Sequence, residues 1–136
     1  MDTRPTRRSE RILLFLVVAY GVASLAHHAH NAVYLHQYPN MPRSLTSAHV
    51  WLAWLVVASV GCAGYWLYRS NRPRMGLLVI ALYALLGLAG LDHYTLAPPA
   101  AHTMAMNATI WGEVVAAAAL LLFAVRRVLG TETFAT

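Results

Sequence analysis

Residues 12–35 read ILLFLVVAYGVASLAHHAHNAVYL, an apolar run that no charged residue interrupts. A helix rises about 1.5 Å per residue, so about 20 apolar residues cross the roughly 30 Å hydrocarbon core of a bilayer. This run is long enough for that purpose. It therefore predicts a transmembrane helix.

Three further apolar runs of this kind follow along the chain, at about residues 47–68, 75–96 and 100–125. Proline interrupts helices, and Pro39 and Pro42 end the first run. Pro98 and Pro99 separate the third run from the fourth. The sequence therefore predicts an all-α fold, an integral membrane four-helix bundle that forms a single domain over residues 1–136.

The composition favours a lipid environment. Hydrophobic residues make up 59% of the chain and charged residues 11%, whereas about 25% of the residues in a soluble domain are charged. The net charge of +5 would suggest nucleic acid as the partner of a soluble protein, but here the cations lie in short segments between the apolar runs. We therefore expect the lipid bilayer, and not nucleic acid, as the partner of these segments.

The arginines predict the orientation, because positively charged loops stay on the cytoplasmic side. The nine arginines that precede the first run, connect the second to the third, or follow the fourth are Arg4, Arg7, Arg8, Arg11, Arg69, Arg72, Arg74, Arg126 and Arg127. Only Arg43 lies on the other side. Both termini are therefore expected to be cytoplasmic, in a membrane of the bacterial cytoplasmic type.

The amino terminus also resembles a cleavable signal peptide, with an arginine-rich start, an apolar core and the sequence Ser24-Leu25-Ala26. However, the apolar run continues beyond Ala26 to Leu35. Removing the run would leave three spans, which cannot place both ends of the chain on one side. The first run is therefore expected to remain a transmembrane helix.

All seven histidines fall in the half of the predicted bundle opposite the arginine-rich segments, namely His27, His28, His30, His36, His49, His93 and His102. Residues three and four apart share a helix face. One face of the first run therefore carries Tyr20, Ser24, His27, His30, Asn31 and Tyr34, while His28 is expected to point elsewhere. The polar site is thus expected toward the non-cytoplasmic side.

The fourth run carries an ionisable residue, Glu113, near the predicted middle of the membrane. Such a residue is costly in lipid, so its default interpretation is functional and it requires a partner. His102, Met106 and Thr109 lie on the same helix face, and Asn107 adjoins them. In the third run, Gly87 and Gly90 share a face with Tyr83 and Tyr94, where the glycines would permit close helix contact or leave room for a ligand.

Imidazole, carboxylate and carboxamide groups that converge from several helices are typical of a metal site in a helix bundle. The candidate metal ligands are His27, His30, His93, Glu113, Asp92 and His49, and the candidate cofactor contacts are His27, His30, Asn31 and Asn107. The sequence therefore predicts an outward-facing site that binds a transition metal ion, Zn, Cu or Fe, and acts on a lipid-soluble or periplasmic substrate.

Several alternatives stay open. Histidines on two different spans can also clamp a haem, and a chain of Glu113, Asn107, His27 and His30 could relay protons. A third alternative is a non-catalytic membrane partner or assembly subunit whose histidines form hydrogen bonds between helices. Small residues at 61–64 and 116–119 would suit a homo-oligomer or a membrane partner protein. The sequence leaves open whether the protein is an enzyme.

Overall fold

A computed structural model describes residues 7–130, so Arg4 lies outside the described residues. The elements are α1 (Arg7–Val33), η1 (Leu35–Gln37), α2 (Ser47–Arg69), α3 (Pro73–Gly87), η2 (Leu88–Asp92), α4 (His93–Leu96), η3 (Pro99–Ala101) and α5 (Met104–Leu129). The prediction of an all-helical fold is confirmed. Four helices are long and apolar enough to cross a membrane, when α3, η2 and α4 are taken as one helix over Pro73–Leu96.

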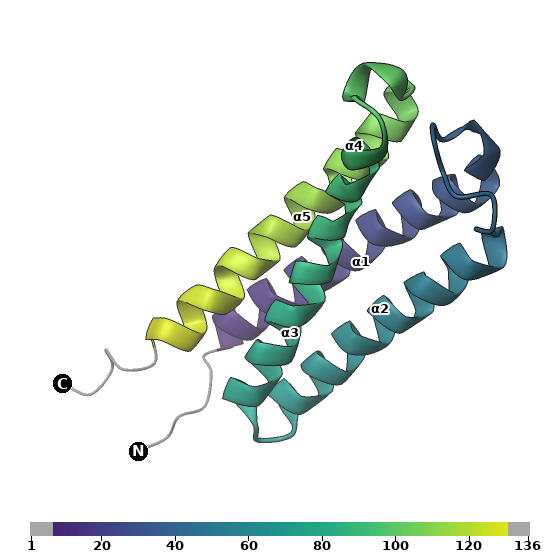
Figure 1. Cartoon of the computed structure of the whole chain (residues 1–136). Helices are drawn as coiled ribbons and strands as arrows, with labels where there is room; N and C mark the ends of the chain where they lie inside the picture. The colour runs from purple at the N-terminus through teal and green to yellow at the C-terminus, as the bar shows by residue number, and fades with distance from the viewer. Residues whose placement is uncertain (1–6, 131–136) are drawn as a thin grey trace.

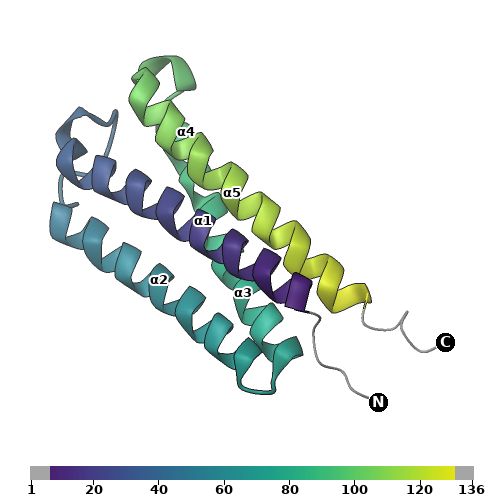
Figure 2. The ribbon, with the colours of Figure 1, turned by 180° about the vertical axis from the view of Figure 1, so that it is seen from behind.

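The four long helices run alternately in opposite directions, as Figures 1 and 2 show from two sides. At one end, here called the arginine end, α1 begins, α2 turns into α3, and α5 finishes. The opposite end, here called the histidine end, holds the α1–α2 loop and the turn between α4 and α5. Around the bundle, α1 packs against α5 and α2, and α3 packs against α2 and α5.

Local chemistry explains where the long helices begin and end. The α2–α3 turn contains Asn71 in the left-handed conformation (φ 59°), which asparagine tolerates, and Pro73 at the first turn of α3, where no backbone N–H is needed. The Oγ1 of Thr46 caps α2, and Thr103 caps α5 by accepting a hydrogen bond from the Met106 backbone N–H. Because of this second cap, α5 starts later than the predicted apolar run.

Glycines bring α2 and α3 into close contact toward the arginine end. A Cβ at Gly76 would lie 2.3 Å from the backbone nitrogen of Tyr68, and one at Gly61 would lie 2.8 Å from the ring of Tyr83. Only glycine permits helix backbones to approach this closely. From the turn that joins α2 to α3, α2 and the α3–α4 segment diverge toward the histidine end in both views.

Polar contacts at the arginine end tie the helices together. The Nη1 of Arg69 donates to Glu10 Oε1 at 2.7 Å, and the Nη2 of Arg127 donates to Ser9 Oγ at 2.6 Å. Between these contacts and the histidine end the interior is apolar, with Leu13, Ile80, Leu120 and the ring of Tyr20 fully buried. This core packs α1 against α5 beneath the polar groups described next.

Candidate functional site

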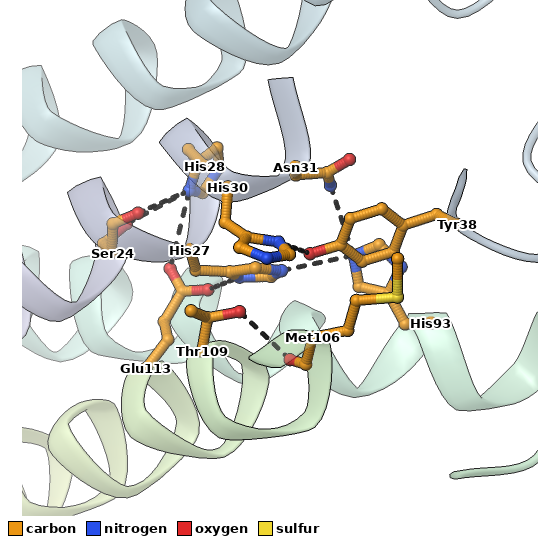
Figure 3. A network of polar contacts seen from close by, with 10 residues as sticks. All are labelled: Ser24, His27, His28, His30, Asn31, Tyr38, His93, Met106, Thr109 and Glu113. Atoms are coloured by element: carbon orange, nitrogen blue, oxygen red, sulfur yellow. Dashed lines mark hydrogen bonds and ion pairs between the residues drawn. The ribbon is translucent and has the colours of Figure 1, made fainter. Parts of the chain in front are cut away.

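A line of buried polar side chains runs along α1 at the histidine end. Tyr20, Ser24, His27 and Asn31, here called the α1 stripe, are at most 8% exposed, because residues three or four apart face the same neighbours. Glu113 of α5 faces this stripe and is 2% exposed. His93 joins them from the start of α4 (Figure 3). Side chains from α1, α4 and α5 thus form one buried polar group.

The central contact joins His27 and Glu113. The Nδ1–H of His27 donates a hydrogen bond to Glu113 Oε2, and both side chains are buried. A hydrogen bond at one ring nitrogen sets the imidazole tautomer. The lone pair of the neutral ring is therefore on Nε2, the nitrogen that points away from Glu113.

This Nε2 atom faces a second imidazole. The His27 Nε2 and His93 Nε2 atoms are 3.3 Å apart, which is longer than the 2.7–3.2 Å usual for a hydrogen bond from a nitrogen donor. Two imidazole ligands of a tetrahedral zinc ion, each about 2.0–2.1 Å from the metal, have nitrogens about 3.3 Å apart. The 3.3 Å separation of the two Nε2 atoms therefore fits two ligands of one metal ion at least as well as it fits a hydrogen bond.

Asn31 supplies a third polar group at the same place. Its Nδ2 atom lies 3.3 Å from His93 Nε2, whereas its Oδ1 atom is buried and has no hydrogen-bond partner within residues 7–130. The oxygen and nitrogen of an amide exchange places when the side-chain amide rotates by half a turn. After that rotation a carbonyl oxygen would face His93 Nε2.

The structure differs from the sequence-based expectation for His28. Its Nδ1 lies 3.9 Å from Glu113 Oε1 and donates to the backbone oxygen of Ser24 at 2.9 Å. At 100° per residue, His28 and His30 lie on opposite sides of the α1 stripe, each rotated from it by roughly 70–90°. Rotation alone therefore does not decide which of them approaches the group; the position of Glu113 on α5 decides it.

Ligating atoms of His27, His28 and Glu113 all lie within 4.8 Å of one another, so these three residues could hold a metal ion. Two ion positions are therefore geometrically available, one between His27 and His93 and one between His27, His28 and Glu113. Both positions border a pocket of about 260 Å³ whose polar wall contains these residues and Asn31.

His30 contacts a tyrosine instead of the buried group. Its Nδ1 lies 2.9 Å from the Oη of Tyr38, and the Tyr38 ring packs 5.0 Å from the ring of His93, centroid to centroid. Burial raises the pKa of Tyr38, so its phenol stays protonated and donates to His30 at neutral pH. Sequence periodicity could not identify Tyr38, because it lies in the loop beyond α1.

The remaining candidates lie apart from the buried group. His49 is used in the cap of α2, where its Nδ1 accepts from the backbone N–H of Thr46 at 3.2 Å. The Asp92 side chain is exposed. Asn107 braces the α4–α5 turn by accepting from the Tyr94 hydroxyl at 2.7 Å. The structure therefore brings together His27, Asn31, His93 and Glu113 from the predicted set, and adds His28.

His102 is also buried, with 7% exposure. Its Nδ1 donates to the backbone oxygen of Pro98 at 3.1 Å, which leaves a lone pair on Nε2, and this atom has no hydrogen-bond partner within residues 7–130. The ring centroids of His102 and His93 are 6.2 Å apart. His102 thus lies beside His93 without belonging to the group.

No protein-family model, curated protein or solved structure matches the chain. The buried group itself combines imidazole, carboxylate and carboxamide, a set of donors that suits Zn, Cu and Fe. It carries one carboxylate and no arginine. Its chemistry is therefore that of a site for a cation or for hydrogen-bonding groups, not for an anion.

Proposed function

We propose that the protein is an integral membrane protein that crosses a bacterial-type cytoplasmic membrane four times. Four apolar helices of sufficient length support this insertion. The arginine end lies in the cytoplasm, because eight of the nine arginines within residues 7–130 belong to the segments at that end. Accordingly, the buried polar group is in the non-cytoplasmic half of the membrane.

We further propose that the buried group binds one transition-metal ion. The observation that carries this proposal is the 3.3 Å separation of His27 Nε2 and His93 Nε2, together with the tautomer that Glu113 imposes on His27. A carboxylate that accepts from the far nitrogen of a metal-bound histidine is a common arrangement, since it orients the ring and raises its basicity. Asn31 Oδ1 is the third ligand after rotation of its amide.

A fourth coordination position remains for water or a substrate. Catalytic zinc sites combine three protein ligands with one such open position, whereas structural sites are closed. Because His27, His93 and Asn31 all line the 260 Å³ pocket, the open position faces that pocket. The proposed role is therefore metal-dependent binding of, or chemistry on, a lipid-soluble or periplasmic substrate.

The proposal is tested by measuring metal per chain in protein purified without chelator. We expect about one ion per chain in the unmodified protein, and a sharp loss in His27→Ala and in His93→Ala. His36→Ala is the matched control, because His36 is an exposed histidine of the α1–α2 loop. Equal metal content in all four proteins, or no binding of Zn, Cu or Fe by any of them, would contradict the metal site.

A second candidate role rests on the same contacts. The hydrogen bonds from Glu113 through His27 to His93 and Asn31 can hold three helices together without any ion. In that case the protein is a non-catalytic membrane partner or assembly subunit, and absence of metal supports it. A haem clamped by His27 and His93 fits poorly, because their facing nitrogens leave no room for a macrocycle between them.

A further inference from the structure

The pocket of about 260 Å³ opens through the side of the bundle, not through its end. Its mouth is formed by Ala53 and Val57 of α2 and by Leu86 and Ala89 of the α3–η2 segment. Ala53, Leu86 and Ala89 are exposed. Ala53 and Val57 precede Gly61 on α2, and Leu86 and Ala89 follow Tyr83, so the mouth lies on the histidine-end side of the Gly61–Tyr83 contact.

The end of the bundle above the buried group is covered by side chains. Tyr38 is 4% exposed, and it packs with Met106 and Ile110, which are 1% and 0% exposed. Figure 3 shows Tyr38 and Met106 next to His93. This cover separates the polar wall of the pocket from the solvent at the histidine end.

The depth of the mouth places it among lipid chains if the helices insert as proposed. Ala53 is six residues after the start of α2 at Ser47, which corresponds to about 9 Å along the helix axis, and Val57 lies about one turn deeper. Apolar side chains surround this opening. A molecule that enters here therefore comes from the membrane, not from water.

The charge of the lining restricts what the pocket can hold. Among the residues that the structure describes, no arginine lines it, so an anionic head would be buried without a counter-charge, which is costly. A cationic head would lie beside the metal ion proposed for the same wall, and like charges repel. The imidazoles and Glu113 instead offer hydrogen-bond donors and acceptors to an uncharged oxygen-bearing group.

We propose that this pocket binds the uncharged, oxygen-bearing head of a membrane amphiphile whose apolar chain leaves between α2 and α3. The pocket volume fits a head that is bound inside and a chain that stays outside. Complete ligands occupy pockets of about 300–1,000 Å³, and about 260 Å³ holds a head alone. The inference rests on the membrane insertion proposed above, and it names the substrate class of the same site. Two classes of membrane amphiphile carry an uncharged, oxygen-bearing head of this kind, namely quinones and long-chain alcohols.

The test follows the melting temperature of the purified protein in phosphatidylcholine nanodiscs during separate titrations with decylubiquinone, dodecanol and dodecane. We expect a saturable rise of several degrees with decylubiquinone or with dodecanol, because a ligand that binds only the folded state stabilises it. The compound that produces the rise identifies the source. Dodecane lacks the oxygen-bearing head and should produce no saturable rise.

Variants at the mouth make the test specific. Ala89→Phe and Ala53→Phe fill the opening from opposite walls and should abolish the rise, whereas Ala63→Phe, an exposed α2 position outside the pocket, should retain it. No saturable rise with either head-bearing compound, an equal rise with dodecane, or an unchanged rise in both mouth variants would overturn the inference.

Metal content is determined on the same preparations, which separates this inference from the metal proposal. A saturable rise in protein without metal upholds the amphiphile and contradicts the metal site. Bound metal without any rise contradicts the amphiphile alone. Each proposal can therefore fail independently of the other.

Discussion

His27 and Glu113 are hydrogen-bonded to each other across α1 and α5, although 86 positions separate them in the chain. Both side chains are buried, and either one alone in an apolar interior would be costly. Their contact therefore fixes the register of α1 against α5 and, at the same time, the tautomer of His27.

Replacing Glu113 with glutamine should weaken metal binding without unfolding the protein. Glutamine keeps the shape and a carbonyl oxygen that can accept from His27 Nδ1, but it removes the charge that raises the basicity of the ring. Loss of such an outer partner lowers metal affinity about 10–100-fold. Titration with metal gives the Kd, and Glu10→Gln at the arginine end is the control. Unchanged affinity with a large fall in Tm would instead assign Glu113 a purely structural role.

His28→Ala and His30→Ala should both retain the metal. An ion between His27 and His93 does not require His28, and His30 is hydrogen-bonded to Tyr38. Helical spacing alone places His30 on the same face as His27 and would therefore predict a loss of metal in His30→Ala. The measurement is the metal content per chain of both variants. A loss of metal in His28→Ala would instead assign the ion to the position between His27, His28 and Glu113.

Tyr38→Phe should lower the free energy of unfolding by about 1 kcal/mol, because it removes the hydrogen bond to His30 but keeps the ring. Burial raises the pKa of Tyr38 in the folded protein above its ordinary value of 10.0. Ionisation therefore favours the unfolded state, and the unmodified protein should lose stability as the pH rises above about 10. The Tyr38→Phe variant should lack this part of the stability loss at high pH, because it has no phenol at position 38 to ionise. A chemical denaturation series at several pH values checks both points, with exposed Tyr34→Phe as control.

Gly76→Ala should destabilise the α2–α3 contact by about 1–3 kcal/mol, since the new Cβ would lie 2.3 Å from the Tyr68 backbone nitrogen. Gly112 is the matched control, because a Cβ there meets nothing within 4 Å. Gly112→Ala should be neutral or stabilising by up to about 1 kcal/mol. Thermal unfolding compares the two. Equal Tm values would show that the close contact does not limit stability.

Reporter fusions at Ser70 and at Tyr38 should give opposite signals. Ser70 lies at the arginine end, which we place in the cytoplasm, and Tyr38 lies in the α1–α2 loop at the other end. The expectation follows from the arginine distribution. The same signal from both positions would contradict the four-span topology.

The sequence was sufficient to predict the four long helices. Apolar runs of membrane length and the prolines between them are local properties, so they can be recognised without tertiary contacts. Helical periodicity also predicted that His27 and Asn31 share one face of the first helix. The cost of a lone carboxylate in an apolar run indicated Glu113 as a candidate. These three residues do lie together in the structure.

Only the tertiary structure decided which neighbours of that face approach Glu113. His28 and His30 flank the α1 stripe at similar angles, and the packing of α5 against α1 places the carboxylate beside His28. Tyr38 reaches His30 because the chain folds back after α1, and His49 is occupied by a helix cap. Periodicity describes a single helix, whereas the tilt of helices and the path of loops depend on contacts between distant residues, such as Gly61 with Tyr83. The face of α1 could therefore be derived from the sequence, but the composition of the site could not.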